Sequence, residues 1–222
     1  MESFVAGQHR YVIPVNPAKD ADGRGLMGRN WPRAQEVSVD QLRDEDIDLA
    51  ILQRPEEFDL ADRWLGRRPG VDVPAVYVEH NTPRPYAVDT VHPLAGRRGI
   101  TLIHVTDFNR LMWDNGLAPT RIITHGIADP GPLYTGDIAA AATMINEPLR
   151  RWRTVGADLV VPAEAGVVSS DVRTLAHALE GFVTDLASAT VAGKSARDFA
   201  MAHFALDRFL TQWDGLIDEC CG

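Results

Sequence analysis

Short apolar runs alternate with longer amphipathic stretches along the first two thirds of the chain. Five runs have the length and composition of β-strands: 11–15, 47–52, 75–78, 101–105 and 121–124. Between them, residues 55–65 repeat apolar side chains every three or four positions, and residues 107–115 read as a helix that stops before Gly116. Strands that alternate with helices predict an α/β fold built on a Rossmann-like parallel sheet.

The last third of the chain has a different, mainly helical pattern. One helix is expected to begin at Ser170 or Asp171, a second to cover 192–203 and a third 206–219. A further strand is expected at 140–145. The expected division is therefore a Rossmann-like domain over 1–145 and a partial, mainly helical domain over 146–222.

The last of these helices has an apolar face that is too large to remain in water. Phe209, Trp213 and Leu216 recur at helical spacing on it. Because the other two helices offer little surface for it, we expect Trp213 to be buried against residues 1–150, or against a second copy of the chain in a homodimer.

Composition indicates a folded protein without a general affinity for anionic polymers. Apolar residues make up 45% of the 222 positions and charged residues 24%, which is enough for a core. The net charge of −9 argues against nucleic acid or an anionic membrane as a partner. Lys19 and Lys194 are the only lysines, and this bias towards arginine is typical of a high-GC, actinobacterial genome.

Cysteine usage and hydropathy favour a cytoplasmic location. The only cysteines, Cys220 and Cys221, are adjacent, so they form neither a disulfide framework nor a zinc motif. No run of 18 apolar residues occurs, so we expect no integral membrane segment. Residues 1–7 lack the basic and apolar regions of a signal peptide.

Polar side chains gather where the predicted strands end. Ligands of parallel α/β sheets bind beyond the carboxyl ends of the strands, which share one edge. A lone histidine at such a place is more often structural than catalytic, but three at successive strand ends favour a shared ligand site. The residues concerned are Gln53, His80, Asn81, Arg84, His104, His125 and Gly126.

Several other chemistries have no motif in this sequence. It contains no G-x-S-x-G elbow, no Walker A loop, no zinc spacing and no G-x-G-x-x-G that opens a helix. We therefore expect neither a cofactor nor a metal.

Five phrases carry a resemblance to a known family. They are 52–57 (LQRPEE), 78–84 (VEHNTPR), 104–109 (HVTDFN), 124–131 (THGIADPG) and 145–151 (INEPLRR). In this order they resemble actinobacterial GT-B glycosyltransferases, which transfer a sugar from a nucleotide-sugar donor with retention of configuration. The resemblance covers nearly the whole chain.

The resemblance implies a role for each matching position. In such enzymes an N-terminal Rossmann-like domain holds the acceptor and a second domain holds the nucleotide-sugar. His80 then lies near the transferred sugar as the catalytic candidate, and His125 and Gly126 lie in the loop that closes the first domain. Arg150, with Arg151 beside it, matches the arginine that binds the donor diphosphate. The substrate-binding candidates are Gln53, Asn81, Arg84, His104, His125, Gly126 and Glu147.

The donor half departs from the family pattern. The lysine that partners the arginine would fall near Val155, and the motif of paired glutamates that holds the donor has no counterpart. The sequence thus predicts sugar transfer from a nucleotide-sugar to an unknown acceptor by a shortened family member. A non-catalytic ligand-binding or structural relic of the fold stays open as the alternative.

Overall fold

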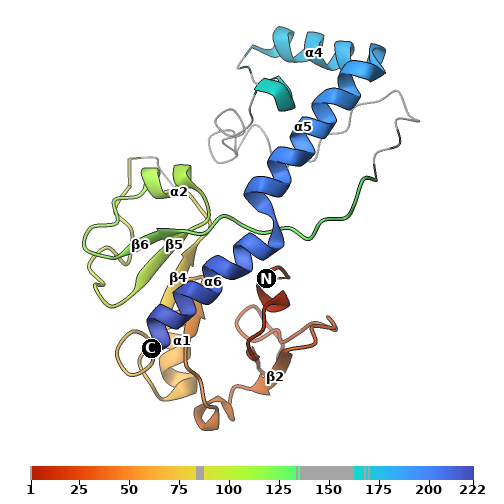
Figure 1. Ribbon diagram of the computed structural model, residues 1–222. Helices are drawn as coiled ribbons and strands as arrows, with labels where there is room; N and C mark the ends of the chain where they lie inside the picture. The colour runs from red at the N-terminus through yellow and green to blue at the C-terminus, as the bar shows by residue number, and fades with distance from the viewer. Residues whose placement is uncertain (1, 84–87, 134, 136–162, 168, 170) are drawn as a thin grey trace. The chain divides into compact units, whose positions relative to one another are not determined.

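The computed structural model describes residues 2–83, 88–133, 135, 163–167, 169 and 171–222 (Figure 1). The chain forms two compact units, one of Met1–Gly126 with Leu206–Gly222 and one of Ile127–Ala205. The expected domain boundary at 145/146 lies outside the described residues.

Among the described residues, the first unit contains six strands, which pair in parallel within two sheets. The smaller sheet pairs β1 (Tyr11–Val15) with β2 (Ala34–Ser38). The larger has the order β3-β4-β5-β6, formed by Ala50–Leu52, Ala75–Glu79, Thr101–His104 and Thr120–Ile122. The predicted α/β class and parallel pairing are confirmed. The prediction of a single sheet is wrong for β1, whose strand partner is β2 rather than a strand of the larger sheet.

Short helices connect these strands. They are η2 (Leu42–Asp44), α1 (Glu57–Leu65) and α2 (Asp107–Met112). η1 (Phe4–Ala6) precedes β1, and α6 (Leu206–Cys221) closes the unit. Gly66 ends α1 at a φ of 64°, in the left-handed region that glycine adopts without strain. The Thr106 side chain caps α2 by accepting a hydrogen bond from the Asn109 N–H.

The larger sheet lies between two apolar layers. Because side chains alternate along a strand, β4 turns Tyr77 to one face and Val76 and Val78 to the other. Tyr77 packs in a cluster with Phe58 of α1. The opposite face belongs to a cluster that contains the following buried residues of β4, β5 and α6: Val76, Val78, Ile103, Phe209, Trp213 and Leu216. Figure 1 shows α6 crossing this sheet.

The packing predicted for the last helix is confirmed. Trp213 is 4% exposed, and its ring makes an edge contact with that of Phe4 at 4.8 Å between centroids. Polar contacts hold the same helix to the unit: Arg121 pairs with Glu219, and Arg208 Nη2 donates to the Thr124 carbonyl at 2.7 Å. The helix is therefore part of the core of the first unit.

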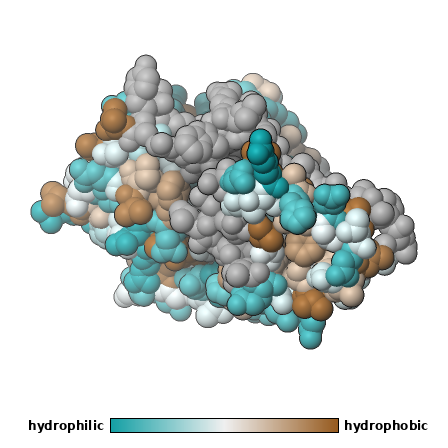
Figure 2. All heavy atoms as spheres, turned by 90° about the horizontal axis from the view of Figure 1, so that it is seen from above, coloured by the Kyte–Doolittle hydropathy of each residue, from teal (hydrophilic) through white to brown (hydrophobic). Residues whose placement is uncertain are grey.

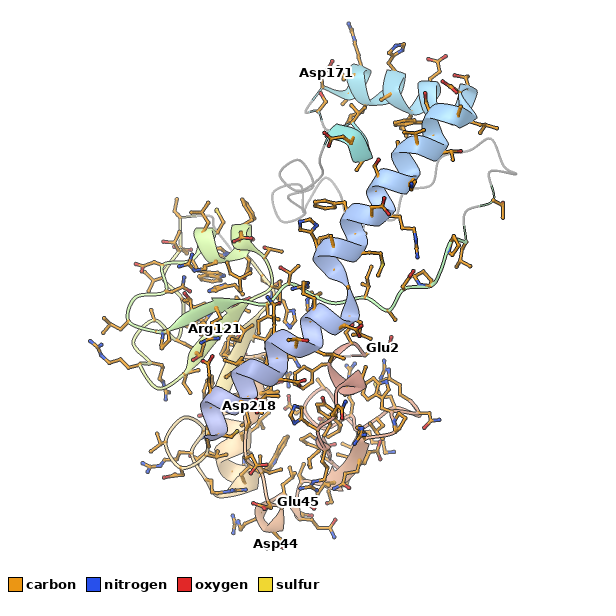
Figure 3. The ribbon with its side chains drawn as sticks, viewed as in Figure 1. Glu2, Asp44, Glu45, Arg121, Asp171 and Asp218 are labelled. Carbon is orange, nitrogen blue, oxygen red and sulfur yellow. The ribbon has the colours of Figure 1, made fainter. Side chains whose placement is uncertain are left out.

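The second unit consists of η4 (Ala163–Ala165), α4 (Val172–Thr184) and α5 (Leu186–Phe204) among the described residues. Asp171 (Figure 3) and Asp185 cap the two long helices by accepting hydrogen bonds from backbone N–H groups. Neither helix has a buried residue, and Leu179 is 51% exposed. On the face seen in Figure 2, hydrophobic and hydrophilic residues lie side by side. The strand expected at 140–145 lies outside the described residues.

Within the part of the chain that the structure describes, every helix is too short or too polar to cross a membrane.

Removing one buried side chain from α6 should destabilise the sheet. Leu216 is 2% exposed, so Leu216→Ala is expected to lower the free energy of unfolding by ~2–5 kcal/mol, through lost burial and a residual cavity. The measurement is hydrogen exchange of the β4 and β5 amides. Leu179→Ala, at an exposed position of α4, is the control and should change the free energy of unfolding derived from these rates by less than ~0.5 kcal/mol. Equal effects of the two substitutions would contradict the packing.

Candidate functional site

Three histidines lie at the carboxyl edge of the larger sheet. His80 follows the last residue of β4, His104 is the last residue of β5, and His125 comes shortly after β6. The strand register pairs Glu79 with His104, and His104 with Ile122, so these strand ends are neighbours. The prediction that the three histidines share one edge is confirmed.

Two of these histidines and a glutamine form an exposed group, which we call the rim trio (Gln53, His80 and His125). The rings of His80 and His125 stack with centroids 5.4 Å apart and planes 12° apart. His80 Nε2 lies 2.9 Å from Gln53 Oε1, the side chain that follows β3. Gln53 accepts this bond, so Nε2 carries the ring proton of neutral His80 and Nδ1 is left as an acceptor.

The stacked rings favour their neutral forms. Partial burial lowers the pKa of His80 below its ordinary value, although the carboxylate of Glu79 opposes this shift. Burial also lowers the pKa of His125, and a charge on the neighbouring His80 lowers it further. Near neutral pH the rim trio therefore presents hydrogen-bond donors and acceptors without a net charge.

The third histidine belongs to a buried network. His104 is fully buried, and its Nδ1 and Nε2 lie 2.7 Å and 2.8 Å from the amide oxygens of Asn109 and Asn115. Asn109 also donates to the carbonyl of Asn81, which accepts a second bond from Trp113 Nε1 at 2.7 Å. Burial lowers the pKa of His104, opposed by the two amide oxygens. A neutral ring donates to one of these two oxygens, and the bonds from Asn109 and Trp113 to the Asn81 carbonyl fix the loop after β4.

Beside the rim trio, both oxygens of a buried carboxylate have hydrogen-bond partners inside the protein. Glu79 is 7% exposed; its Oε1 accepts from the Asn81 N–H at 2.6 Å, and its Oε2 lies 3.2 Å from His92 Nε2. His92 Nδ1 accepts from the Leu94 N–H, so Nε2 carries the proton and donates to Glu79. These bonds turn the carboxylate towards the loop backbone.

Gly126 has a packing reason to be glycine. A Cβ atom at this position would lie 2.5 Å from Phe209 Cβ, closer than real Cβ atoms approach, so glycine lets α6 cross this loop. Ser3 Oγ donates to the Gly126 carbonyl at 2.5 Å. With Arg208 bonded to the carbonyl of Thr124, these contacts fix the loop that carries His125.

The structure thus brings Gln53, His80 and His125 together and places Asn81 and His104 in the adjoining network. Four predicted site residues lie outside the described residues: Arg84, Glu147, Arg150 and Arg151. Among the described residues, no three His, Cys, Asp or Glu side chains converge as metal ligands.

Sequence reasoning missed four residues that shape this edge: His92, Asn109, Asn115 and Arg208. Asn109 follows the Thr106 cap by three positions, and this cap pattern is its only local signal. The other three are distant in sequence from the strand end that they contact, so no local pattern reveals them.

Comparison with known proteins gives no family for this chain. Neither a scan against models of protein families, nor a search of curated proteins, nor a search of solved structures found a match.

The lowered histidine pKa values predict a stability that falls with acidification. The folded protein binds fewer protons than the unfolded chain between the lowered pKa values and the ordinary histidine pKa of ~6.5. The histidine contribution to the free energy of unfolding should therefore be constant above that pH and decline below it, as denaturation at a series of pH values would measure. Replacing His80 and His125 by Gln should flatten the decline, whereas His177→Gln, at an exposed position of α4, should leave it unchanged. An unchanged slope in the double variant would refute neutral rings.

Proposed function

We propose that this protein takes part in sugar transfer and binds a nucleotide-sugar or its acceptor at the rim trio. The observation that carries the proposal is the stacked His80–His125 pair with Gln53 bonded to it, at the sheet edge where α/β proteins bind ligands. Neutral imidazoles and an amide offer both donors and acceptors, which suits a ligand rich in hydroxyl groups.

The chemistry of retaining transfer fits a site of this kind. The resemblance of the five phrases to retaining glycosyltransferases supports such a reaction, and it requires no external base. His80 would lie beside the reacting sugar and donate to, or accept from, its hydroxyl groups. Arg150 and Arg151 are proposed for the donor diphosphate, through charge-assisted hydrogen bonds.

A second candidate, binding without catalysis, is favoured by one feature of the site. In the described part of the chain, neither His80 nor His125 is hydrogen-bonded to a carboxylate, because Glu79 is held by Asn81 and His92. A histidine that acts as a base commonly has such a partner to orient it. The two candidates differ in one measurable step, the release of nucleoside diphosphate.

Calorimetry with UDP-glucose and GDP-mannose tests the proposal. One of these donors is expected to give saturable heat, and His80→Ala should weaken its binding by ~2- to 10-fold, the loss of about one net hydrogen bond. His177→Ala is the control and should bind as the wild-type chain does. Slow release of nucleoside diphosphate would support transfer, and binding without release the non-catalytic candidate. Absence of binding by both donors, or equal binding by His80→Ala, would refute a donor site at the rim trio.

A further inference from the structure

The two sheets of the first unit are not joined to each other: β1 is an edge strand of one, and β3 is an edge strand of the other. At the amino ends of these strands, Arg10 donates to Glu45 Oε2 at 2.7 Å and to the Asp46 carbonyl at 2.9 Å (Glu45 is labelled in Figure 3). At their carboxyl ends, Arg54 donates to Asp22 Oδ1 at 3.1 Å. These contacts join the segments before and after the two strands, yet β1 and β3 belong to separate sheets.

The edge of β1 that faces away from β2 has free main-chain groups. Tyr11 donates to the Arg33 carbonyl, and the Val15 carbonyl accepts from Val39, so both residues point towards β2. Because main-chain groups alternate along a strand, those of Val12 point the other way. Within the described ranges, the N–H and C=O groups of Val12 have no hydrogen-bond partner there.

The edge of β3 that faces away from β4 is free as well. Ala50 donates to the Pro74 carbonyl, so its main-chain groups point towards β4 and those of Ile51 point away. β3 is an edge strand of its sheet, and the N–H and C=O groups of Ile51 have no partner among the residues that the structure describes.

A cavity of about 920 Å³ separates these edges. We call it the strand slot. It is lined by residues 11–14 of β1 and by residues 49–53, which include β3. Phe4 and Ile217 also line it. Ile217 belongs to α6, and Phe4 packs against the cluster that contains the buried residues of α6. Ala61 and Trp64 of α1 line it too. A strand of five residues in a packed sheet fills ~800 Å³, which is the product of its length (~3.3 Å per residue), the spacing between strands (~4.8 Å) and the spacing between packed layers (~10 Å). The cavity matches that volume.

We propose that the strand slot binds one extended, apolar segment of another polypeptide, which adds as a β-strand and joins the two sheets. The segment would bond to Val12 on one side and to Ile51 on the other, as in other cases of β-strand addition. Ala61 and Trp64 of α1, together with Phe4 and Ile217, line the slot with apolar side chains, so the side chains of the segment that face them are expected to be apolar, as in the central strands of parallel sheets. The N–H of Gly25 bonds to the Pro14 carbonyl at 3.1 Å and closes the carboxyl end, which limits the paired stretch to about five residues.

The full chain can be titrated with a capped peptide of five Val and Ile residues between two lysines. We expect saturable binding, a higher melting temperature, and slower hydrogen exchange at the amides of Val12 and Ile51. The control peptide has proline at its central position, which removes an N–H donor, and it should not bind.

A matched pair of proline substitutions tests the position of the bound strand. In Ile51→Pro the bonds between β3 and β4 are kept, because only the outward N–H is lost. Ile122→Pro is the control: Ile123 donates to the His104 carbonyl, so the N–H of Ile122 faces the outer edge of β6. The peptide should bind ~2- to 10-fold more weakly to Ile51→Pro, and unchanged to Ile122→Pro. If Ile51→Pro does not fold, exchange in the wild-type chain decides.

Four results would overturn the proposal. They are no saturable binding, equal binding of the proline peptide, protection at Ile122 rather than at Val12 and Ile51, and protection of those two amides by self-association of the chain without peptide.

Discussion

The rest of the first unit depends on the burial of α6 against the larger sheet. Phe209, Trp213 and Leu216 fill the face that Val76, Val78 and Ile103 present, and each such side chain contributes ~1.5–3 kcal/mol when fully buried. The same helix sets the shape of the candidate site. Gly126 lets it pass within contact distance of the loop after β6, and Arg208 holds two carbonyls of that loop. His125 therefore stacks on His80 as a consequence of core packing.

The network around His104 and the rim trio lie at the same sheet edge, but they differ in how many donor and acceptor atoms they leave for a ligand. In the network around His104, the His104 and Asn109 side chains are buried and lie within hydrogen-bond distance of each other, so the network specifies the loop conformation. The rim trio is exposed and keeps acceptor and donor atoms free for a ligand after its internal bond is made. Asn81 connects the two groups, since its carbonyl is held by the network while the residue itself follows His80. The buried network thus positions the exposed one.

Periodicity predicted the elements with large apolar runs and failed where such runs are absent. β2 is Ala-Gln-Glu-Val-Ser, in which Val37 alone is buried, so its pattern is that of a loop. The interruption between β1 and β3 depends on which edges meet, and no local pattern encodes that. The same holds for the histidines: strand-end position predicted His80, His104 and His125 together. The sequence does not distinguish their roles. In the structure His104 bonds to Asn115 inside the protein, whereas His80 and His125 stack on each other at the exposed edge.

The strand slot and the rim trio meet at Gln53. Its side chain bonds to His80, its backbone N–H donates to Glu57 at the start of α1, and the residue lines the slot. β3 is short and is bonded to a neighbour along one edge only, so its carboxyl end has less support than those of β4 and β5. Hydrogen bonds added at Ile51 would restrict the backbone two residues before Gln53. Occupation of the strand slot and order in the rim trio are therefore coupled through β3. A ligand that binds better when Gln53 is ordered would strengthen binding of the extended segment, and the segment would strengthen binding of the ligand by the same factor.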